Sequence, residues 1–295
     1  MGAFDEQLDI ATKLKVARGT SLVIVSTKAG SMTPVAETKI RKAFQESLVV
    51  EFDPDMDIEK LVAPSAKVVV AGGDGTIEWV VRRLVETKHP LGIISLGTFN
   101  NFAKSLRLPK TVDAAIRVIK QGKPTPITLG RVNGHVFLEA AAIGLFGEAI
   151  GAGEAAKDRA FGDFAQAARR VFEARPFKYE LTEDIRGYGT AMSLVFSNTS
   201  SIGSQLPVGD NTPEDPYLEL SLHSGWGRGE IVKRALARAI PSRVGYRGIG
   251  QLFKFRRVEV KTTPSVSVYA DSSKVSRTPA TITAELSALK VILPP

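Results

Sequence analysis

The segment GGDGT, residues 72–76, surrounds one carboxylate with three glycines. Glycines allow backbone amides to approach a phosphate closely, and the first turn of a helix attracts anions. The carboxylate of Asp74 would repel a bare phosphate, but it can hold a Mg²⁺ ion that is bound to the phosphate. The segment therefore indicates a site for a metal-bound nucleotide. A second interpretation stays open, in which Asp74 only caps the following helix in a tight turn.

A second glycine turn lies in the segment LGTFNNFA, residues 96–103. Apolar runs precede both turns, so each turn is expected to follow a strand, and open parallel sheets bind ligands at the carboxyl ends of their strands. Other nucleotide-binding patterns do not fit. The third glycine of a dinucleotide fingerprint would fall on Glu78, and the chain has no Walker-type Gly-Lys-Ser/Thr motif. We expect the two turns to form one site together.

The elements that position these turns alternate along the first part of the chain. Short β-branched runs alternate with amphipathic segments from Ser21 to about Gly122, which is typical of βαβ units and a parallel sheet. Thr33 is suited to cap the first long helix, and Pro34 is suited to its first position. The pattern predicts an α/β fold with a doubly wound, nucleotide-binding domain over residues 1–124.

The second part of the chain has a different pattern of expected secondary structure. Alternating strands predominate after the segment GKPTP, with a single long helical insertion. Residues 125–295 are therefore expected to form a β-rich substrate domain that is mostly antiparallel and resembles a sandwich. The final run, ALKVILPP, is expected to be one more strand, and the pattern leaves open which sheet it joins.

The composition narrows the class of partner. The chain has 295 residues, with 39 Lys and Arg against 31 Asp and Glu, and a net charge of +8. This charge favours anionic partners such as nucleotides or acidic lipid headgroups. Nucleic acid is not expected, because the chain has no helix-turn-helix signature and no zinc spacing. The absence of cysteine fits a reducing, cytoplasmic setting, and the apolar runs are shorter than the roughly 20 residues that span a bilayer.

The two glycine turns together resemble the nucleotide site of the diacylglycerol kinase catalytic superfamily, which includes bacterial lipid kinases and sphingosine kinases. The chain is similar to that family over nearly its whole length from Ser21. The resemblance implies that one loop holds the phosphates of ATP and that a second loop forms the opposite wall. These loops consist of Gly72, Gly73, Asp74, Gly75 and Thr76, and of Gly97, Thr98 and Asn100. Gly30 is what remains of the family's first nucleotide loop.

The resemblance also implies residues on the acceptor side. The family's closing segment normally reads Asp-Gly-Glu, and the matching residues here are Asp271, Ser272 and Ser273. Asp271 is therefore the candidate general base, without the usual glutamate. Asp215 matches an acidic residue that the family associates with a structural Mg²⁺, although Pro216 replaces the glycine that normally follows it.

These features imply an ATP- and Mg²⁺-dependent lipid kinase of phospholipid metabolism, with its site in the cleft between the two domains. The acceptor would be the hydroxyl of diacylglycerol or a related lipid. Two alternatives stay open. One is a kinase of a soluble substrate similar to NAD kinase, and the other is a nucleotide- or lipid-binding homologue that has lost turnover with its missing carboxylates.

A basic segment suggests how such an enzyme would reach a lipid. Residues 229–240 place apolar side chains on one helical stripe and basic ones beside it, and further Lys and Arg residues follow as far as Lys261. This surface could hold the protein peripherally on an anionic inner leaflet. The alternative is a helix whose apolar stripe faces the core and whose basic side is solvated.

Overall fold

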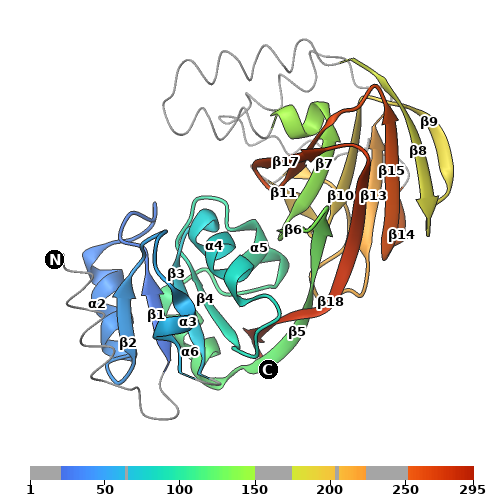
Figure 1. Ribbon diagram of the computed structural model, residues 1–295. Helices are drawn as coiled ribbons and strands as arrows, with labels where there is room; N and C mark the ends of the chain where they lie inside the picture. Colours follow the sequence, from blue (N-terminus) through green and yellow to red (C-terminus); the bar gives the residue numbers. More distant parts are fainter. Residues whose placement is uncertain (1–20, 64–65, 150–174, 203–205, 224–251) are drawn as a thin grey trace, which may run out of the picture. The chain divides into compact units, whose positions relative to one another are not determined.

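The computed structural model describes residues 21–63, 66–149, 175–202, 206–223 and 252–295 (Figure 1). The chain divides into two compact units. The first unit consists of Met1–Ile127 with Ser287–Pro295, and the second of Thr128–Leu286.

The first unit is built on a parallel sheet. Its strands are β1 (Leu22–Val25), β2 (Leu48–Glu51), β3 (Val68–Gly72) and β4 (Leu91–Ser95), in the order β2-β1-β3-β4. All three neighbouring pairs are parallel. Every residue of β1 and β3 is buried, which is the pattern of strands that are covered by helices on both faces of a sheet.

Helices cover both faces of this sheet. They are α2 (Pro34–Ala43), α3 (Ile58–Leu61), α4 (Asp74–Leu84), α5 (Asn101–Ser105) and α6 (Val112–Gln121). Ile40 of α2 and Ile119 of α6 share one hydrophobic core with residues of β1, β3 and β4. Helix α4 packs on β3 and β4 with a separate set of buried residues, so it covers the opposite face. This arrangement confirms the expected doubly wound fold.

The start of α2 follows the expected capping chemistry. Thr33 is the N-cap, and its Oγ1 accepts the N–H of Ala36 at 3.1 Å. Pro34 occupies the first helical position, where its missing N–H leaves no helical bond unmade. Ile40 and Phe44 are buried on the same side of the helix. Both predictions for this helix are confirmed.

The second unit contains an antiparallel six-stranded sheet. Its order is β14-β13-β10-β7-β16-β17. The strands are β7 (Ala140–Gly144), β10 (Ser193–Ser197), β13 (Leu218–His223), β14 (Leu252–Phe255), β16 (Ser267–Ala270) and β17 (Ser273–Arg277). A separate ribbon pairs β11 (Ser201–Ile202) with β12 (Leu206–Pro207). Alternate residues of β10 face different buried clusters, with Leu194 and Phe196 in one and Val195 in another.

A second antiparallel layer completes this core. It pairs β8 (Phe177–Glu183) with β9 (Gly187–Ala191) and β15 (Arg257–Thr263), and β15 with β18 (Ala280–Leu293). Strand β5 (Lys123–Val132) pairs with β6 (His135–Phe137). The core cluster combines residues of both layers, such as Phe196 of β10 and Val260 of β15. The sandwich-like, mostly antiparallel architecture is confirmed.

Strand β18 corrects the expected extent of the second domain. The sequence pattern assigned residues 125–295 to that domain, whereas Ser287–Pro295 belong to the first unit. The reason is that β18 continues for 14 residues. Its beginning pairs antiparallel with β15, and Val291 near its end pairs in parallel with Leu91 of β4.

His223 ends β13 inside the second unit. Its side chain stacks on Phe146, with ring centroids 6.3 Å apart, and its Nε2 lies 3.0 Å from Ser221 Oγ. Only 5% of the residue is exposed. Burial lowers the pKa of His223 from its ordinary value of 6.5 to about 4, because the charged ring would lose its hydration.

This burial predicts a pH dependence of stability. Between pH 6.5 and 4 the unfolded chain binds a proton that folded His223 does not, so stability falls as the pH falls through this window. At pH 5 we expect wild type to have lost about 2 kcal/mol more of its unfolding free energy, relative to pH 7, than His223→Gln has lost. Urea unfolding at the two pH values measures this difference. Equal losses in the two proteins would contradict the prediction.

Candidate functional site

Asp74 is the first residue of α4 and joins the two glycine loops of the first unit. Its Oδ2 accepts the backbone N–H of Asn100 at 3.0 Å. The N-cap of α4 is Gly73, and no side chain caps this helix end. The interpretation of Asp74 as a simple helix cap is therefore wrong. Its carboxylate instead lies at the positive end of α4 and connects the turn after β3 with the turn after β4.

Asn100 holds the second loop closed through its side chain. The Asn100 Oδ1 accepts the N–H of Gly97 at 2.9 Å, and its Nδ2 donates to the carbonyl of Gly97 at 2.8 Å. A carboxamide can donate and accept at once, which an aspartate cannot do. The backbone of Asn100 is left-handed, with φ of 52°, a conformation that asparagine tolerates better than most residues. These properties explain the residue type at this position.

The glycines differ in what requires them. A Cβ on Gly97 would lie 2.9 Å from Asp74 Oδ2, and a Cβ on Gly72 would lie 2.8 Å from Thr76 Cβ. Both positions therefore need glycine for packing. A Cβ on Gly75 would meet no atom within 4 Å, and Gly75 is exposed. Packing within the protein does not explain this glycine, whereas the approach of a ligand to the loop would.

The first loop of the unit reaches the same edge of the sheet. Ser31 donates its N–H to the carbonyl of Leu96 at 2.9 Å, and a Cβ on Gly30 would lie 3.6 Å from Thr98 Oγ1. The carboxyl ends of β1, β3 and β4 thus bring three loops together. These loops contain all the predicted nucleotide residues, namely Gly30, Gly72, Gly73, Asp74, Gly75, Thr76, Gly97, Thr98 and Asn100.

Side-chain contacts along α4 support the helix that carries Asp74. Glu78 Oε1 lies 2.7 Å from Arg82 Nη2, as expected for residues one turn apart. The guanidinium of Arg83 lies 3.5 Å from the centre of the Trp79 ring, and burial lowers the pKa of Arg83. Trp79 also packs edge-on against Phe52, with ring centroids 5.2 Å apart. It is therefore a packing residue.

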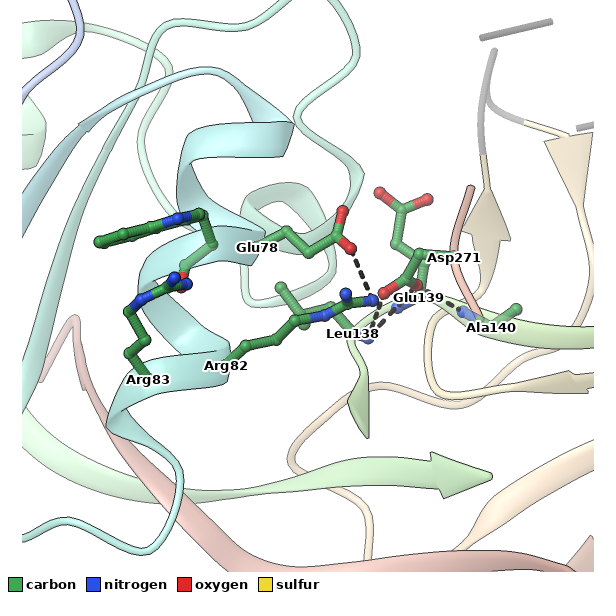
Figure 2. Close-up of polar contacts among 8 residues, drawn as sticks. Glu78, Arg82, Arg83, Leu138, Glu139, Ala140 and Asp271 are labelled. Carbon is green, nitrogen blue, oxygen red and sulfur yellow. Dashed lines mark hydrogen bonds and ion pairs between the residues drawn. The ribbon is translucent and has the colours of Figure 1, made fainter. Parts of the chain in front are cut away.

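Asp271 follows β16 in the second unit, and backbone amides surround its carboxylate (Figure 2). Its Oδ1 accepts the N–H of Glu139 at 2.8 Å and that of Ala140 at 3.3 Å, and its Oδ2 accepts the N–H of Leu138 at 3.0 Å. The N–H of Asp271 donates to the carbonyl of Ala140 at 2.8 Å. The backbone of Asp271 is left-handed, with φ of 50°. The carboxylate therefore fixes the start of β7 to the β16–β17 turn.

The 138–140 segment was not among the predicted site residues. Glu139 is half-buried and lies between two buried neighbours. A signal was present, because Glu139 is the one charged residue in the otherwise apolar run VFLEAAAIGLF. Ser273, which takes the place of the family's glutamate, is exposed at the start of β17.

Asp215 lies in a turn before β13 in the second unit. Its Oδ2 accepts the N–H of Thr212 at 2.8 Å and the Oγ1 hydroxyl of Thr212 at 3.1 Å. Local turn closure thus uses one oxygen of this carboxylate. No group of three or more His, Asp or Glu residues suited to a metal occurs in the described ranges. A structural Mg²⁺ at Asp215 stays a prediction that its surroundings do not support.

Asp74 fits a nucleotide-bound Mg²⁺ better than an ion held by protein groups alone. Mg²⁺ in nucleotide sites usually takes one or two carboxylates and completes its coordination with phosphates and water. Asp74 commits its Oδ2 to Asn100. Within the described part of the chain, its Oδ1 has no hydrogen-bond partner. One carboxylate oxygen beside the glycine loop is what such an ion requires from the protein.

The predicted basic surface falls partly outside the described residues, since residues 229–240, Arg243 and Arg247 are not among them. Lys254, Arg256, Arg257 and Lys261 are exposed in and between β14 and β15. Lys254 Nζ donates to Tyr217 Oη at 2.9 Å, and this bond raises the pKa of Lys254. Among the described residues, no helix has the length and apolar character needed to cross a membrane.

Comparison with known proteins gives a sequence match to one family. Residues 20–132 match the family model of the diacylglycerol kinase catalytic domain. A diacylglycerol kinase of Staphylococcus saprophyticus is 40% identical over 78 residues, which is 26% of this chain and 26% of that protein. A diacylglycerol kinase of Staphylococcus aureus is 32% identical over 118 residues, which is 38% of each chain. The matches thus span only 26% to 38% of the length of these curated relatives.

Solved structures resemble this chain in fold over a longer part of its length than the sequence match covers. A protein of Bacillus anthracis, provisionally named a diacylglycerol kinase, superposes with a TM-score of 0.72 and 24% identity. A second structure from that organism, of a diacylglycerol kinase, gives 0.69 and 21%. Each covers 94% of this chain and 97% of its own, so the likeness in fold includes both units. The sequence match over residues 20–132 and this likeness in fold together support a relationship to the diacylglycerol kinase catalytic-domain superfamily.

Proposed function

We propose that the protein is a kinase that transfers the γ-phosphate of ATP to the hydroxyl of a lipid, with diacylglycerol as the first candidate. The observation that carries this proposal is the bond between Asp74 and the Asn100 amide, which joins two glycine loops at the carboxyl ends of adjacent strands. The match of residues 20–132 to the family model supports the reaction class. The identity of the acceptor as a lipid is the more specific part of the proposal.

The first unit supplies the donor half of this chemistry. The exposed turn at Gly75 lets backbone amides at the start of α4 approach phosphate oxygens, and the helix end attracts their charge. Asp74 would hold Mg²⁺, which when bound neutralises charge on the transferring phosphate. The fixed hydrogen bonds of Asn100 keep the loop from rearranging when the nucleotide binds.

The second unit supplies the acceptor half. Phosphoryl transfer depends mainly on positioning and on charge stabilisation, so the acceptor side has to orient a hydroxyl and take its proton. Asp271 is the candidate carboxylate from the sequence, and its backbone-bound position makes it rigid. Exposed Lys254, Arg256, Arg257 and Lys261 would favour an anionic lipid surface over neutral membranes.

A direct assay tests the proposal. Purified protein is incubated with γ-labelled ATP, Mg²⁺ and one acceptor at a time, either mixed micelles of diacylglycerol, phosphatidylglycerol or a sphingoid base, or NAD in solution. We expect label in an organic-soluble product from the micelles. Label in NADP would instead establish the soluble-substrate alternative. Nucleotide binding with no labelled product would show a homologue that binds without turnover.

Replacement of Asp74 separates its charge from its structural bond. In Asp74→Asn the new side-chain oxygen can still accept the Asn100 N–H, so we expect an unchanged melting temperature. Loss of the charge removes a metal ligand, and kcat/KM should fall by about 100-fold or more. Asp113→Asn, at an exposed residue that pairs with Lys39, is the matched control and should keep wild-type turnover. Wild-type turnover in Asp74→Asn would limit Asp74 to holding the loops.

Gly75 provides a test of ligand approach. Gly75→Ala meets open space inside the first turn of a helix, so its unfolding free energy should equal that of wild type or exceed it by up to about 1 kcal/mol. The added methyl group faces the region through which a phosphate would approach, so KM for ATP should rise by about tenfold or more.

Two further glycine variants serve as comparisons for Gly75→Ala. Gly187→Ala, at another glycine whose Cβ would meet nothing within 4 Å, should change neither stability nor KM. Gly72→Ala should destabilise the protein, because its Cβ would overlap Thr76. A Gly75→Ala variant with wild-type KM for ATP would show that phosphate does not approach this turn.

A further inference from the structure

We infer that Glu139 accepts the proton of the acceptor hydroxyl and that Asp271 is a positioning residue that holds Glu139 in place. This inference rests on the proposed kinase function, and it changes the role that the sequence suggested for Asp271. It follows from how the second unit uses the two carboxylates. Asp271 is bound by backbone amides, whereas Glu139 belongs to the segment that those amides form.

The hydrogen bonds of Asp271 make it a poor proton acceptor. Its Oδ1 receives the N–H of Glu139 at 2.8 Å and those of Leu138 and Ala140 at 3.3 Å, and its Oδ2 receives the Leu138 N–H at 3.0 Å. Accepting a proton would weaken the bonds that fix the start of β7. These contacts are those of a structural clamp.

The backbone of Glu139 is fixed from two sides. Its N–H is bound by Asp271, and its carbonyl accepts the N–H of Asn198 at 2.8 Å and the Oγ1 of Thr199 at 3.4 Å. Asn198 Nδ2 also donates to the carbonyl of Leu138 at 3.1 Å. Asn198 and Thr199 are fully buried. A residue held in this way can direct its side chain reproducibly, which proton transfer requires.

The side chain of Glu139 is the polar group that this segment presents. Leu138 and Ala140 are only 3% and 4% exposed, whereas Glu139 is half-buried. Figure 2 shows the Asp271 carboxylate turned toward the three amides and the Glu139 carboxylate turned away from them. Ser273 cannot take this role, because a serine hydroxyl is a far weaker base than a carboxylate at neutral pH.

The step that this assigns to Glu139 is a simple proton transfer. The acceptor oxygen forms a bond to the γ-phosphorus of ATP, and the bond between that phosphorus and the β,γ-bridging oxygen breaks with its electron pair, which leaves ADP. The hydroxyl proton passes to the Glu139 carboxylate and is later released to water. No oxidant, reductant or further co-reactant is needed.

Substitutions at Glu139 test the inference with labelled ATP and the acceptor that wild type phosphorylates. Glu139→Gln should lower kcat by about 100-fold or more. KM for ATP should stay within about twofold of wild type, because the change affects the transfer step. Added sodium formate should restore part of the activity of Glu139→Ala, since a small carboxylate can occupy the vacated space. Glu180→Gln, at an exposed residue of β8, should match wild type.

Asp271 provides the comparison that separates a base from a clamp. Asp271→Ala should lower kcat and the melting temperature together, and formate should not restore its activity, because the displaced segment no longer positions Glu139. The inference is overturned if Glu139→Gln keeps wild-type kcat, or if formate rescues Asp271→Ala but not Glu139→Ala. A wild-type protein that labels no acceptor refutes the proposed function, and this inference with it.

Discussion

The hydrogen bond from the Asn100 amide to the Asp74 carboxylate is the interaction on which the first unit's candidate site depends. Strands β3 and β4 are parallel neighbours, so their following loops emerge at the same edge. The bond converts this proximity into one fixed structure. It also explains Gly97, because any side chain there would overlap Asp74. The loops therefore acquire their arrangement without a ligand, which would reduce the ordering cost of binding a nucleotide there.

In the second unit, too, an aspartate carboxylate accepts backbone N–H groups, but it binds more of them. Asp271 also accepts backbone N–H groups from a distant loop, but it accepts three of them through both oxygens. Asp74 commits only its Oδ2 within the described residues. The two carboxylates thus differ in the number of backbone amides that they bind, and under our proposals this difference lets Asp74 hold a metal while Asp271 positions its neighbours. Residue type alone, which is aspartate in both cases, does not make this distinction.

The sequence predicted the elements well and the side-chain partners poorly. Thr33 and Pro34 mark the start of α2 through local chemistry, and the glycine segment at Asp74 lies between strand and helix as expected. Asp74 and Asn100 are 26 residues apart, and Asp271 and Leu138 are 133 apart. Such contacts depend on which strands become neighbours, which periodicity does not specify. The length of β18 escaped prediction for the same reason.

Glu139 is a candidate carboxylate that the family resemblance did not indicate. A family pattern assigns a role to a place in the sequence, and here that place is occupied by Ser273. The fold instead brings another carboxylate next to Asp271, because the N–H of Glu139 is one of its donors. A charged residue within an apolar run is costly to bury unless it is paired or hydrogen-bonded. The loss of a carboxylate at one position therefore does not by itself indicate loss of chemistry, because an adjacent strand can supply it.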